Sequence, residues 1–126
     1  PTGFDWHWLL GDETALPAIA RRLAELPASA VATVRIQLSN PADQRVLVSA
    51  ARVNLQWVSA LPAAVEALAL PPGAGFVWAA GEHSDMAAVR RAMLAKPGVD
   101  PKRMRISAYW KRGAANHHED LVSAAG

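Results

Sequence analysis

The apolar run at residues 76–80, Phe-Val-Trp-Ala-Ala, constrains the fold of this chain more than any other segment. A Pro-Pro-Gly sequence at residues 71–73 precedes the run, and Gly81 follows it directly. A short apolar run between such breaks is typical of a parallel β-strand that is buried on both faces of its sheet. The sequence therefore predicts a central strand here, closed by a glycine turn.

A helix is expected directly after this turn. Ser84 can accept hydrogen bonds from the first free amides, and the apolar side chains that follow repeat at helical spacing. These side chains are Met86, Val89, Met93 and Leu94. In open α/β sheets, the loops at the carboxyl ends of the strands form the ligand crevice, so the turn between strand and helix is a candidate part of a site.

The rest of the chain contains four more strand patterns and two more helix patterns. The strands are expected at residues 6–10, 31–38, 53–58 and 104–110, and the three helices at residues 14–26, 61–70 and 84–95. Thr14 is the expected cap of the first helix, Pro62 opens the second, and residues 46–48 fit either a helix edge or an extended segment. Because parallel neighbours need crossover connections, this alternation predicts an α/β fold with a five-stranded parallel, doubly wound sheet.

Composition limits the class of protein. The 126 residues suffice for one domain, and 52% apolar with 19% charged residues predicts a globular chain. The net charge of +2 comes from scattered basic residues, so no nucleic-acid partner is expected. The lack of cysteine excludes a disulfide scaffold, a thiolate zinc site and a cysteine nucleophile, and favours a cytoplasmic location. No apolar run approaches the ~20 residues that span a bilayer, so no membrane span is expected.

The first turn after a strand, Gly11-Asp12-Glu13-Thr14, has the position where dinucleotide-binding folds place a pyrophosphate on a helix N-terminus. It is not a Gly-x-Gly-x-x-Gly sequence, and two carboxylates would repel a phosphate unless they point away. In the alternative interpretation, Asp12 and Glu13 only interact with the positive end of the helix dipole. The residues themselves leave both interpretations open.

Two further segments lie at the ends of strands, at the same edge of the sheet. Glu82 can bind a ribose or a carboxamide while Gly81 admits a ring close to the backbone, or both can form a tight turn with a solvated glutamate. Residues 109–112, Tyr-Trp-Lys-Arg, suit stacking on a flat ring and attraction of an anionic ligand. Because Tyr109 and Trp110 alternate across their strand, one of the two is expected in the core.

Other chemistries are not expected from the sequence. The histidines at positions 7, 83, 117 and 118 form no His-x-x-x-His pair, so no metal site is predicted. There is no Gly-x-Ser-x-Gly sequence, so hydrolysis is not predicted either. The tryptophans on predicted strands are expected in the core, namely Trp6, Trp8, Trp57 and Trp78.

Residues 9–19, 77–82 and 107–113 resemble, in this order, the three signature blocks of the siderophore-interacting protein family. The blocks read Leu-Leu-Gly-Asp-Glu-Thr-Ala-Leu-Pro-Ala-Ile, Val-Trp-Ala-Ala-Gly-Glu and Ser-Ala-Tyr-Trp-Lys-Arg-Gly. The family consists of flavin-dependent ferric-siderophore reductases of the ferredoxin reductase superfamily. The resemblance covers nearly the whole chain. It implies that residues 1–126 are the family's C-terminal pyridine-nucleotide-binding domain, similar to the NADP-binding domain of ferredoxin reductases.

The family's N-terminal FAD-binding β-barrel would precede Pro1 and is absent from this sequence. The chain starts without methionine, so an excised domain or a processed product is expected. In the family, NAD(P)H lies across the carboxyl ends of the strands and passes a hydride to FAD, which reduces the siderophore-bound ferric ion. The resemblance therefore implies two cofactors, NADPH or NADH and FAD, and three partners: the nicotinamide dinucleotide, a ferric siderophore and the FAD domain of the parent chain.

The resemblance also implies roles for individual residues. Carried over as cofactor-binding are Gly11, Asp12, Glu13, Thr14 and Ala15 under the pyrophosphate, Gly81 and Glu82 beside the nicotinamide and its ribose, and Tyr109 and Trp110 near the flavin. Lys111 and Arg112 are carried over as binding the siderophore. Thr14 and the amides behind it are expected to be the main phosphate donors. Arg45 and Arg52 favour NADPH over NADH, although Asp43 lies near them in the sequence.

A second interpretation stays open beside the reductase. The chain can be a non-catalytic nucleotide-binding or interaction module that lacks a flavin partner, and a structural domain without a ligand is a third option. A flavin-binding motif upstream in the parent chain would favour the reductase. The polar segment after Gly113 is expected to be mobile in this fragment.

Overall fold

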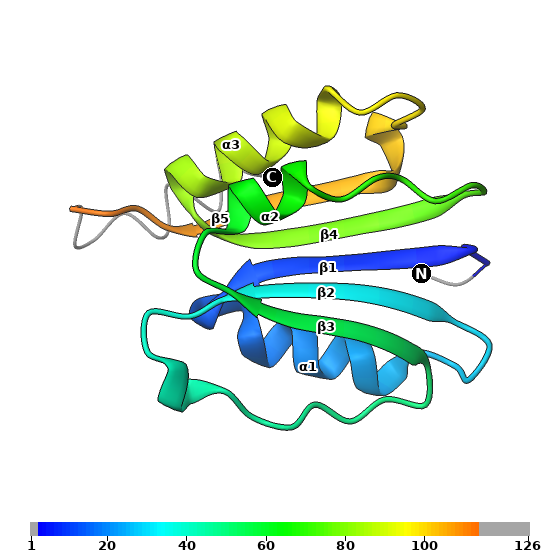
Figure 1. Cartoon of the computed structure of the whole chain (residues 1–126), viewed down its shortest axis with the longest axis horizontal. Coiled ribbons are helices and arrows are strands. Elements are labelled where there is room, and N and C mark those ends of the chain that lie inside the picture. The colour runs from blue at the N-terminus through cyan, green and yellow to red at the C-terminus, as the bar shows by residue number, and fades with distance from the viewer. Residues whose placement is uncertain (1–2, 114–126) are drawn as a thin grey trace.

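The computed structural model describes residues 3–113 and shows one α/β domain with a five-stranded, all-parallel sheet (Figure 1). The strand order is β3-β2-β1-β4-β5. The strands are β1 (Trp6–Asp12), β2 (Val31–Gln37), β3 (Arg52–Val58), β4 (Gly75–Glu82) and β5 (Met104–Trp110). The predicted doubly wound fold is confirmed, and β4 lies next to β1 near the middle of the sheet as its apolar run indicated. The expectation for the segment after Gly113 falls outside the described residues.

Helices cover both faces of the sheet. Helix α1 (Leu16–Glu25) lies on one face, and α2 (Leu61–Glu66) and α3 (His83–Leu94) lie on the other (Figure 1). Short 3₁₀ turns stand at η1 (Glu13–Ala15), η2 (Pro41–Asp43) and η3 (Pro101–Arg103). No helix of the described residues is long and apolar enough to cross a membrane.

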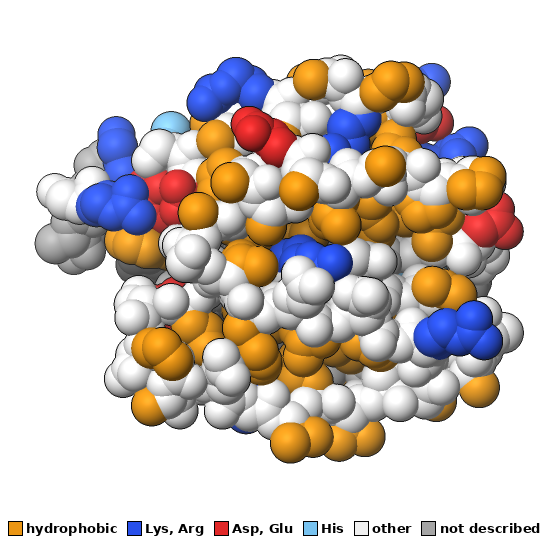
Figure 2. Space-filling model, viewed as in Figure 1, with side chains coloured by type: hydrophobic (Ala, Val, Ile, Leu, Met, Phe, Trp, Pro, Cys, Tyr) orange, Lys and Arg blue, Asp and Glu red, His pale blue; other side chains and the backbone are white. Residues whose placement is uncertain are grey.

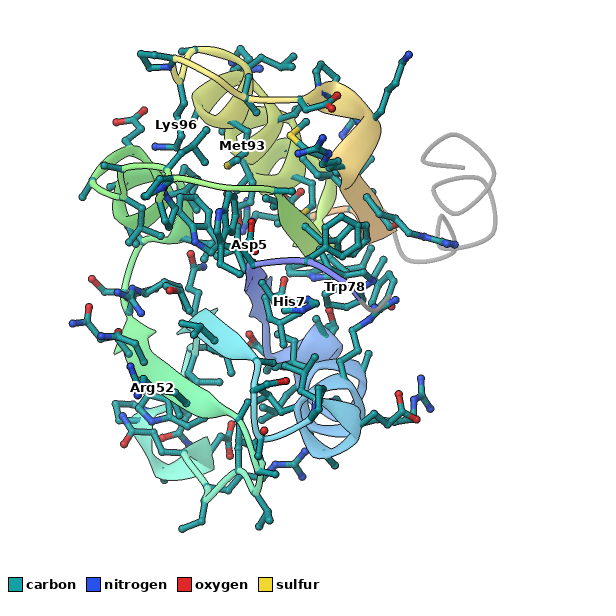
Figure 3. The ribbon with its side chains drawn as sticks, turned by 90° about the vertical axis from the view of Figure 1, so that its right-hand side faces the viewer. Asp5, His7, Arg52, Trp78, Met93 and Lys96 are labelled. Carbon is teal, nitrogen blue, oxygen red and sulfur yellow. The ribbon has the colours of Figure 1, made fainter. Side chains whose placement is uncertain are left out.

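The core has two layers, one on each face of the sheet. The layer under α2 and α3 includes Trp8, Leu10 and Met93, whereas the layer under α1 includes Ile19 and Trp78. Seen along the sheet from its amino edge, Trp78 lies on the side of α1, and Met93 and Lys96 lie on the side of α3 (Figure 3). Trp6, Trp8 and Trp78 are buried as predicted, and Trp57 is partly buried against the α1 layer.

Two helix starts differ from the sequence prediction. The Asp12 side chain caps η1, and α1 follows from Leu16, so Thr14 is not the cap. Helix α3 begins at His83 because the Glu82 carboxylate accepts the amide of Asp85, which places Ser84 inside the first turn. In both cases the last residue of a strand supplies the cap, and a carboxylate takes the place of the predicted hydroxyl.

Three other details differ as well. Helix α2 ends at Glu66, four residues before the predicted end at Leu70. Near its observed end, the Lys96 ammonium donates hydrogen bonds to the carbonyl groups of Val65 and Leu68. Leu94 is 47% exposed and does not belong to the buried face of α3. Residues 46–48 form no regular element.

Parallel pairing brings the carboxyl ends of three neighbouring strands together. Gly11 lies beside Ala80 in the register of β1 with β4, and Glu82 lies beside Trp110 in the register of β4 with β5. The β4 and β5 register shifts by one residue between Gly81 and Glu82. This irregularity lies at the edge where Asp12, Glu82 and Trp110 meet. Figure 1 shows this edge on the left.

Candidate functional site

The Asp12 carboxylate ties together the ends of β1, β4 and β5. It is 4% exposed, and its Oδ1 accepts hydrogen bonds from the amide of Thr14 at 2.9 Å and from the Thr14 hydroxyl. Its Oδ2 accepts from the amide of Glu82 at 3.1 Å and from Trp110 Nε1 at 2.9 Å. Both oxygens are therefore used within the protein. The two carboxylates of the first turn do not converge on a ligand, since Glu13 accepts from the Ser39 hydroxyl.

Glu82 forms the second half of this network. It is 1% exposed, and its Oε1 accepts from the Ser84 hydroxyl at 2.7 Å and from the amide of Asp85 at 2.9 Å. Its Oε2 accepts from the amide of Arg112 at 3.1 Å. The Arg112 guanidinium lies 3.6 Å from Glu82 and 3.7 Å from Asp85. The interpretation of Glu82 as a solvated glutamate is therefore wrong, because it caps α3 and anchors the chain after β5.

The two carboxylates beside Arg112 have pKa values that move in opposite directions. Burial alone would raise the pKa of Glu82, but hydrogen bonds from Ser84, Asp85 and Arg112, together with the Arg112 charge, outweigh it and lower this pKa. Burial and then the neighbouring charge of Glu82 raise the pKa of Asp85. The surroundings thus favour the ionised form of Glu82 and disfavour the ionised form of Asp85.

This assignment predicts a pH dependence of stability. We expect Glu82→Gln to lower the free energy of unfolding at pH 7 by roughly 1–3 kcal/mol, because a charged acceptor is lost. The folded-state pKa of Glu82 is lowered, so its stabilisation is present above the unfolded-state pKa and is lost as the pH falls through the folded-state value. The variant should therefore lose less stability in acid than the parent. Urea unfolding at pH 7 and at about pH 3 measures both effects.

Asp85→Asn is the matched control with the opposite sign. The pKa of Asp85 is raised, so protonation in acid favours the folded state, and the substitution should make the acid-induced loss of stability steeper. At pH 7 its effect should stay within about 0.5 kcal/mol, because its ion pair with Arg112 is partly exposed. Equal slopes in the parent and both variants would contradict these pKa directions.

Gly11 and Gly81 allow close packing inside the protein. A Cβ atom at Gly11 would lie 2.7 Å from the Cβ of Ala15 and 2.8 Å from the carbonyl oxygen of Ala80. A Cβ atom at Gly81 would lie 2.8 Å from Oδ2 of Asp12. These contacts account for both glycines without a bound ring or phosphate. Ala15, also predicted as a cofactor contact, is fully buried against Gly11.

The aromatic residues at the end of β5 and the cationic residues after it divide between core and surface. Tyr109 is half-buried and packs edge-on against Trp78, with 6.4 Å between ring centroids. Trp110 is also half-buried, and the Arg112 guanidinium lies 5.5 Å from the centre of its ring. Lys111 and Arg112 are exposed. The prediction that one aromatic is core holds best for Tyr109, whereas Trp110 belongs to the candidate site.

The structure does not bring every predicted residue to this edge. The amide and hydroxyl of Thr14 donate to Asp12, and their role as phosphate donors stays a prediction. Arg52 is the first residue of β3 and therefore lies at the amino edge of the sheet, far from the carboxyl ends (Figure 3). It is thus not placed to choose between NADPH and NADH. Asp85 was missed by the sequence analysis, and its place three residues after Glu82 was the available signal.

The other surface features of the described residues do not indicate a second candidate site at the carboxyl edge of the sheet. A hollow of about 680 Å³ lies between α2 and α3, lined by Leu70, Ala92 and Lys96 among others, but it is at the C-terminal end of α3 and so at the opposite edge. No group of three or more acidic or histidine side chains in residues 3–113 is placed to hold a metal ion. Lys and Arg side chains are spread over the visible face of the molecule in Figure 2 and form no single patch there.

Comparisons with known proteins identify relatives over most of the chain. An uncharacterized protein of Mycobacterium tuberculosis is 34% identical over an alignment of 128 positions, which covers 86% of this chain and 45% of that protein. Ferric vibriobactin reductase ViuB of Vibrio cholerae is 27% identical, over 92% of this chain and 47% of that protein. The NADPH-dependent ferric-chelate reductase of Escherichia coli is 28% identical, over 87% of this chain and 46% of that protein. The chain therefore spans about half the length of these curated relatives.

Solved structures agree with the fold. A siderophore utilization protein from T. fusca has a TM-score of 0.81 at 32% identity, over 94% of this chain and 50% of that chain. The siderophore-interacting protein SipS from Aeromonas hydrophila has a TM-score of 0.84 at 24% identity, over 98% of this chain and 53% of that chain, and it bears on the fold alone. The model of the family described as siderophore-interacting protein matches residues 4–113. Since this match covers most of the sequence, the chain belongs to the siderophore-interacting protein family.

Proposed function

We propose that this chain is the pyridine-nucleotide-binding domain of a ferric-siderophore reductase. In this proposal NADPH or NADH binds at the carboxyl edge of the sheet, and its hydride passes to FAD held mainly by a neighbouring barrel domain. The observation that carries the proposal is the network of Asp12 and Glu82, which fixes the ends of β1, β4 and β5 where α/β sheets bind their ligands. Relatives named as ferric reductases support the class of reaction.

The described residues fit a flat, anionic ligand at the end of β5. Trp110 offers a half-buried ring, and the exposed side chains of Lys111 and Arg112 supply positive charge beside it. The first turn is a less suitable phosphate site, because Thr14 already donates to Asp12. When bound, FAD would convert the two-electron hydride into one-electron reduction of siderophore-bound Fe(III), and the resulting Fe(II) is held more weakly by hard oxygen ligands.

The two buried carboxylates have a positioning role in this proposal. Asp12 holds the indole of Trp110, and Glu82 holds both the main chain and the guanidinium of Arg112. The oxygens of both carboxylates already accept hydrogen bonds from groups of the protein. The ends of the strands are therefore fixed before any ligand arrives, which lowers the entropic cost of ordering a nucleotide against a flavin.

Calorimetric titration with NADPH and NADH tests the proposal. The titration is made with this chain alone and again after adding a separately expressed, FAD-loaded barrel half of a family member. We expect binding of one nucleotide in both samples and reduction of the flavin only in the mixture. No binding heat and no flavin reduction would contradict the proposal. Binding without reduction in the mixture would favour the non-catalytic nucleotide-binding module.

Lys111 offers a test of the cationic surface. In the reconstituted mixture, Lys111→Glu should raise the KM for an anionic ferric tris-catecholate about fivefold at low salt, because one attractive charge becomes repulsive. The effect should shrink in high salt, and kcat should not change. Lys102→Glu makes the same charge change in η3, at the opposite edge, and should alter KM less than about twofold. Equal effects of the two variants would exclude a local role for Lys111.

A further inference from the structure

The hollow of about 680 Å³ between α2 and α3 has the size of a binding site for a small molecule. Such sites typically enclose about 300–1,000 Å³. Its lining comes from residues 66–70, at the end of α2 and after it, and from residues 88–97, in the second half of α3 and after it. Helix α3 starts at the carboxyl end of β4 and runs back over the sheet, so the hollow lies at the amino edge (Figure 1). We call it the amino-edge pocket.

Apolar side chains form most of the wall of this pocket. Leu68 and Leu70 are half-buried and line the side that follows α2. Ala88 and Ala92 line the side of α3, where Ala88 is half-buried and Ala92 is buried. Because alanine side chains are short, α3 leaves open the space that larger side chains would fill. The wall therefore suits the apolar body of a ligand.

Lys96 places a fixed positive charge in the wall. Its ammonium donates to the carbonyl group of Val65 at 2.8 Å and to that of Leu68, and it lies 5.9 Å from the centre of the Trp8 ring. Figure 3 shows Lys96 on the side of the sheet that carries α3. An ammonium group has three N–H donors, and the described residues supply acceptors for two of them. The third donor is available to an oxygen of a ligand.

The charges around the amino-edge pocket favour an anion. Of the charged side chains that line it in the described part of the chain, Arg91 and Lys96 are cationic and Glu66 is acidic. Burial lowers the pKa of Lys96, and the charge of Glu66 offsets this only in part. A second negative group beside the ammonium would therefore be favourable. Arg91 is exposed and adds positive charge at the rim.

We propose that the amino-edge pocket binds a small amphipathic carboxylate. Its apolar body lies between Leu68, Leu70 and Ala92, and its carboxylate accepts from the Lys96 ammonium close to Arg91. This site is independent of the proposed reductase function, because Asp12 and Glu82 lie at the carboxyl edge of the sheet and the pocket lies at the amino edge.

An NMR titration of the whole chain with decanoate tests the site. We expect saturable shifts of amide signals within residues 66–70 and 88–96, and no comparable shifts of Gly81, Glu82 and Trp110 at the carboxyl edge. Decyltrimethylammonium has an equally long chain with a positive head group, and it should bind at least about fivefold more weakly. Shifts that do not saturate, or that centre on the carboxyl edge, would overturn the proposal. Equal affinities for the two probes would overturn the assigned class of ligand.

Paired variants on α3 test the lining. Ala88→Phe fills the pocket and should raise the Kd for decanoate at least about tenfold, and Arg91→Glu should raise it about fivefold at low salt. The matched controls are Ala87→Phe and Arg90→Glu, at exposed positions of the same helix outside the lining, and they should change the Kd less than about twofold. Because Arg91 is exposed, its variant decides the question even if Ala88→Phe does not fold. Equal effects of Arg91→Glu and Arg90→Glu would overturn the proposal.

Discussion

Replacing Asp12 by alanine is expected to lower the free energy of unfolding by roughly 3–5 kcal/mol. The carboxylate accepts from Thr14, from the amide of Glu82 and from the Trp110 indole, and it is almost fully buried. Alanine leaves the buried amide of Glu82 and the half-buried indole of Trp110 without this acceptor, and an unsatisfied buried donor costs about 1–3 kcal/mol. Urea unfolding followed by circular dichroism measures the loss, and tryptophan fluorescence reports whether the indole of Trp110 has moved.

Two control variants show whether the loss of stability comes from the hydrogen bonds of Asp12 or from a general disturbance of the first turn. Glu13→Ala removes the adjacent carboxylate, whose partner Ser39 is exposed, and should cost less than about 1 kcal/mol. Trp110→Phe removes one donor and keeps Asp12, so its loss should lie between those of the other two variants. A loss for Asp12→Ala no larger than that for Glu13→Ala would show that the network does not hold the strand ends together.

The sequence predicted the fold because its strands and helices are encoded locally. The apolar run before Gly81 and the helical spacing of Met86, Val89 and Met93 depend on neighbours within one element, and all three side chains are buried as expected. The helix ends were predicted less well. Helix α3 starts one residue before Ser84 because Glu82 caps it, and glutamate is not among the residue types that usually cap a helix, so the sequence favoured Ser84.

The sequence predicted which strand ends come together, but not the contacts between their side chains. Parallel strands that alternate with helices bring their carboxyl ends to one edge of the sheet, as the register of β1, β4 and β5 shows. The bond from Trp110 to Asp12 spans 98 positions, and the amide of Glu82 donates to Asp12 across 70 positions. No local pattern predicts such pairs. For this reason the sequence leaves open whether the acidic turn binds a ligand, whereas in the structure Asp12 joins three strands.

Gly11→Ala is expected to lower the free energy of unfolding by about 3 kcal/mol, the second large effect. The added Cβ would meet the side chain of Ala15 and the carbonyl oxygen of Ala80, and the strand backbone that carries this oxygen cannot move alone. The substitution also lowers the conformational entropy of the unfolded chain, which favours folding slightly. The measured decrease in the free energy of unfolding is therefore slightly smaller than the cost of the steric conflict. The unfolding midpoint in urea gives the value directly.

Gly98→Ala is the matched control, because Gly98 has a φ of +82° and no atom near the position of an added Cβ. It should cost only roughly 1 kcal/mol through backbone strain. If Gly11 instead serves ligand approach, Gly11→Ala would leave stability near that of the parent and weaken nucleotide binding alone. A large stability loss at Gly11 with a small one at Gly98 therefore assigns Gly11 to the packing of the first turn.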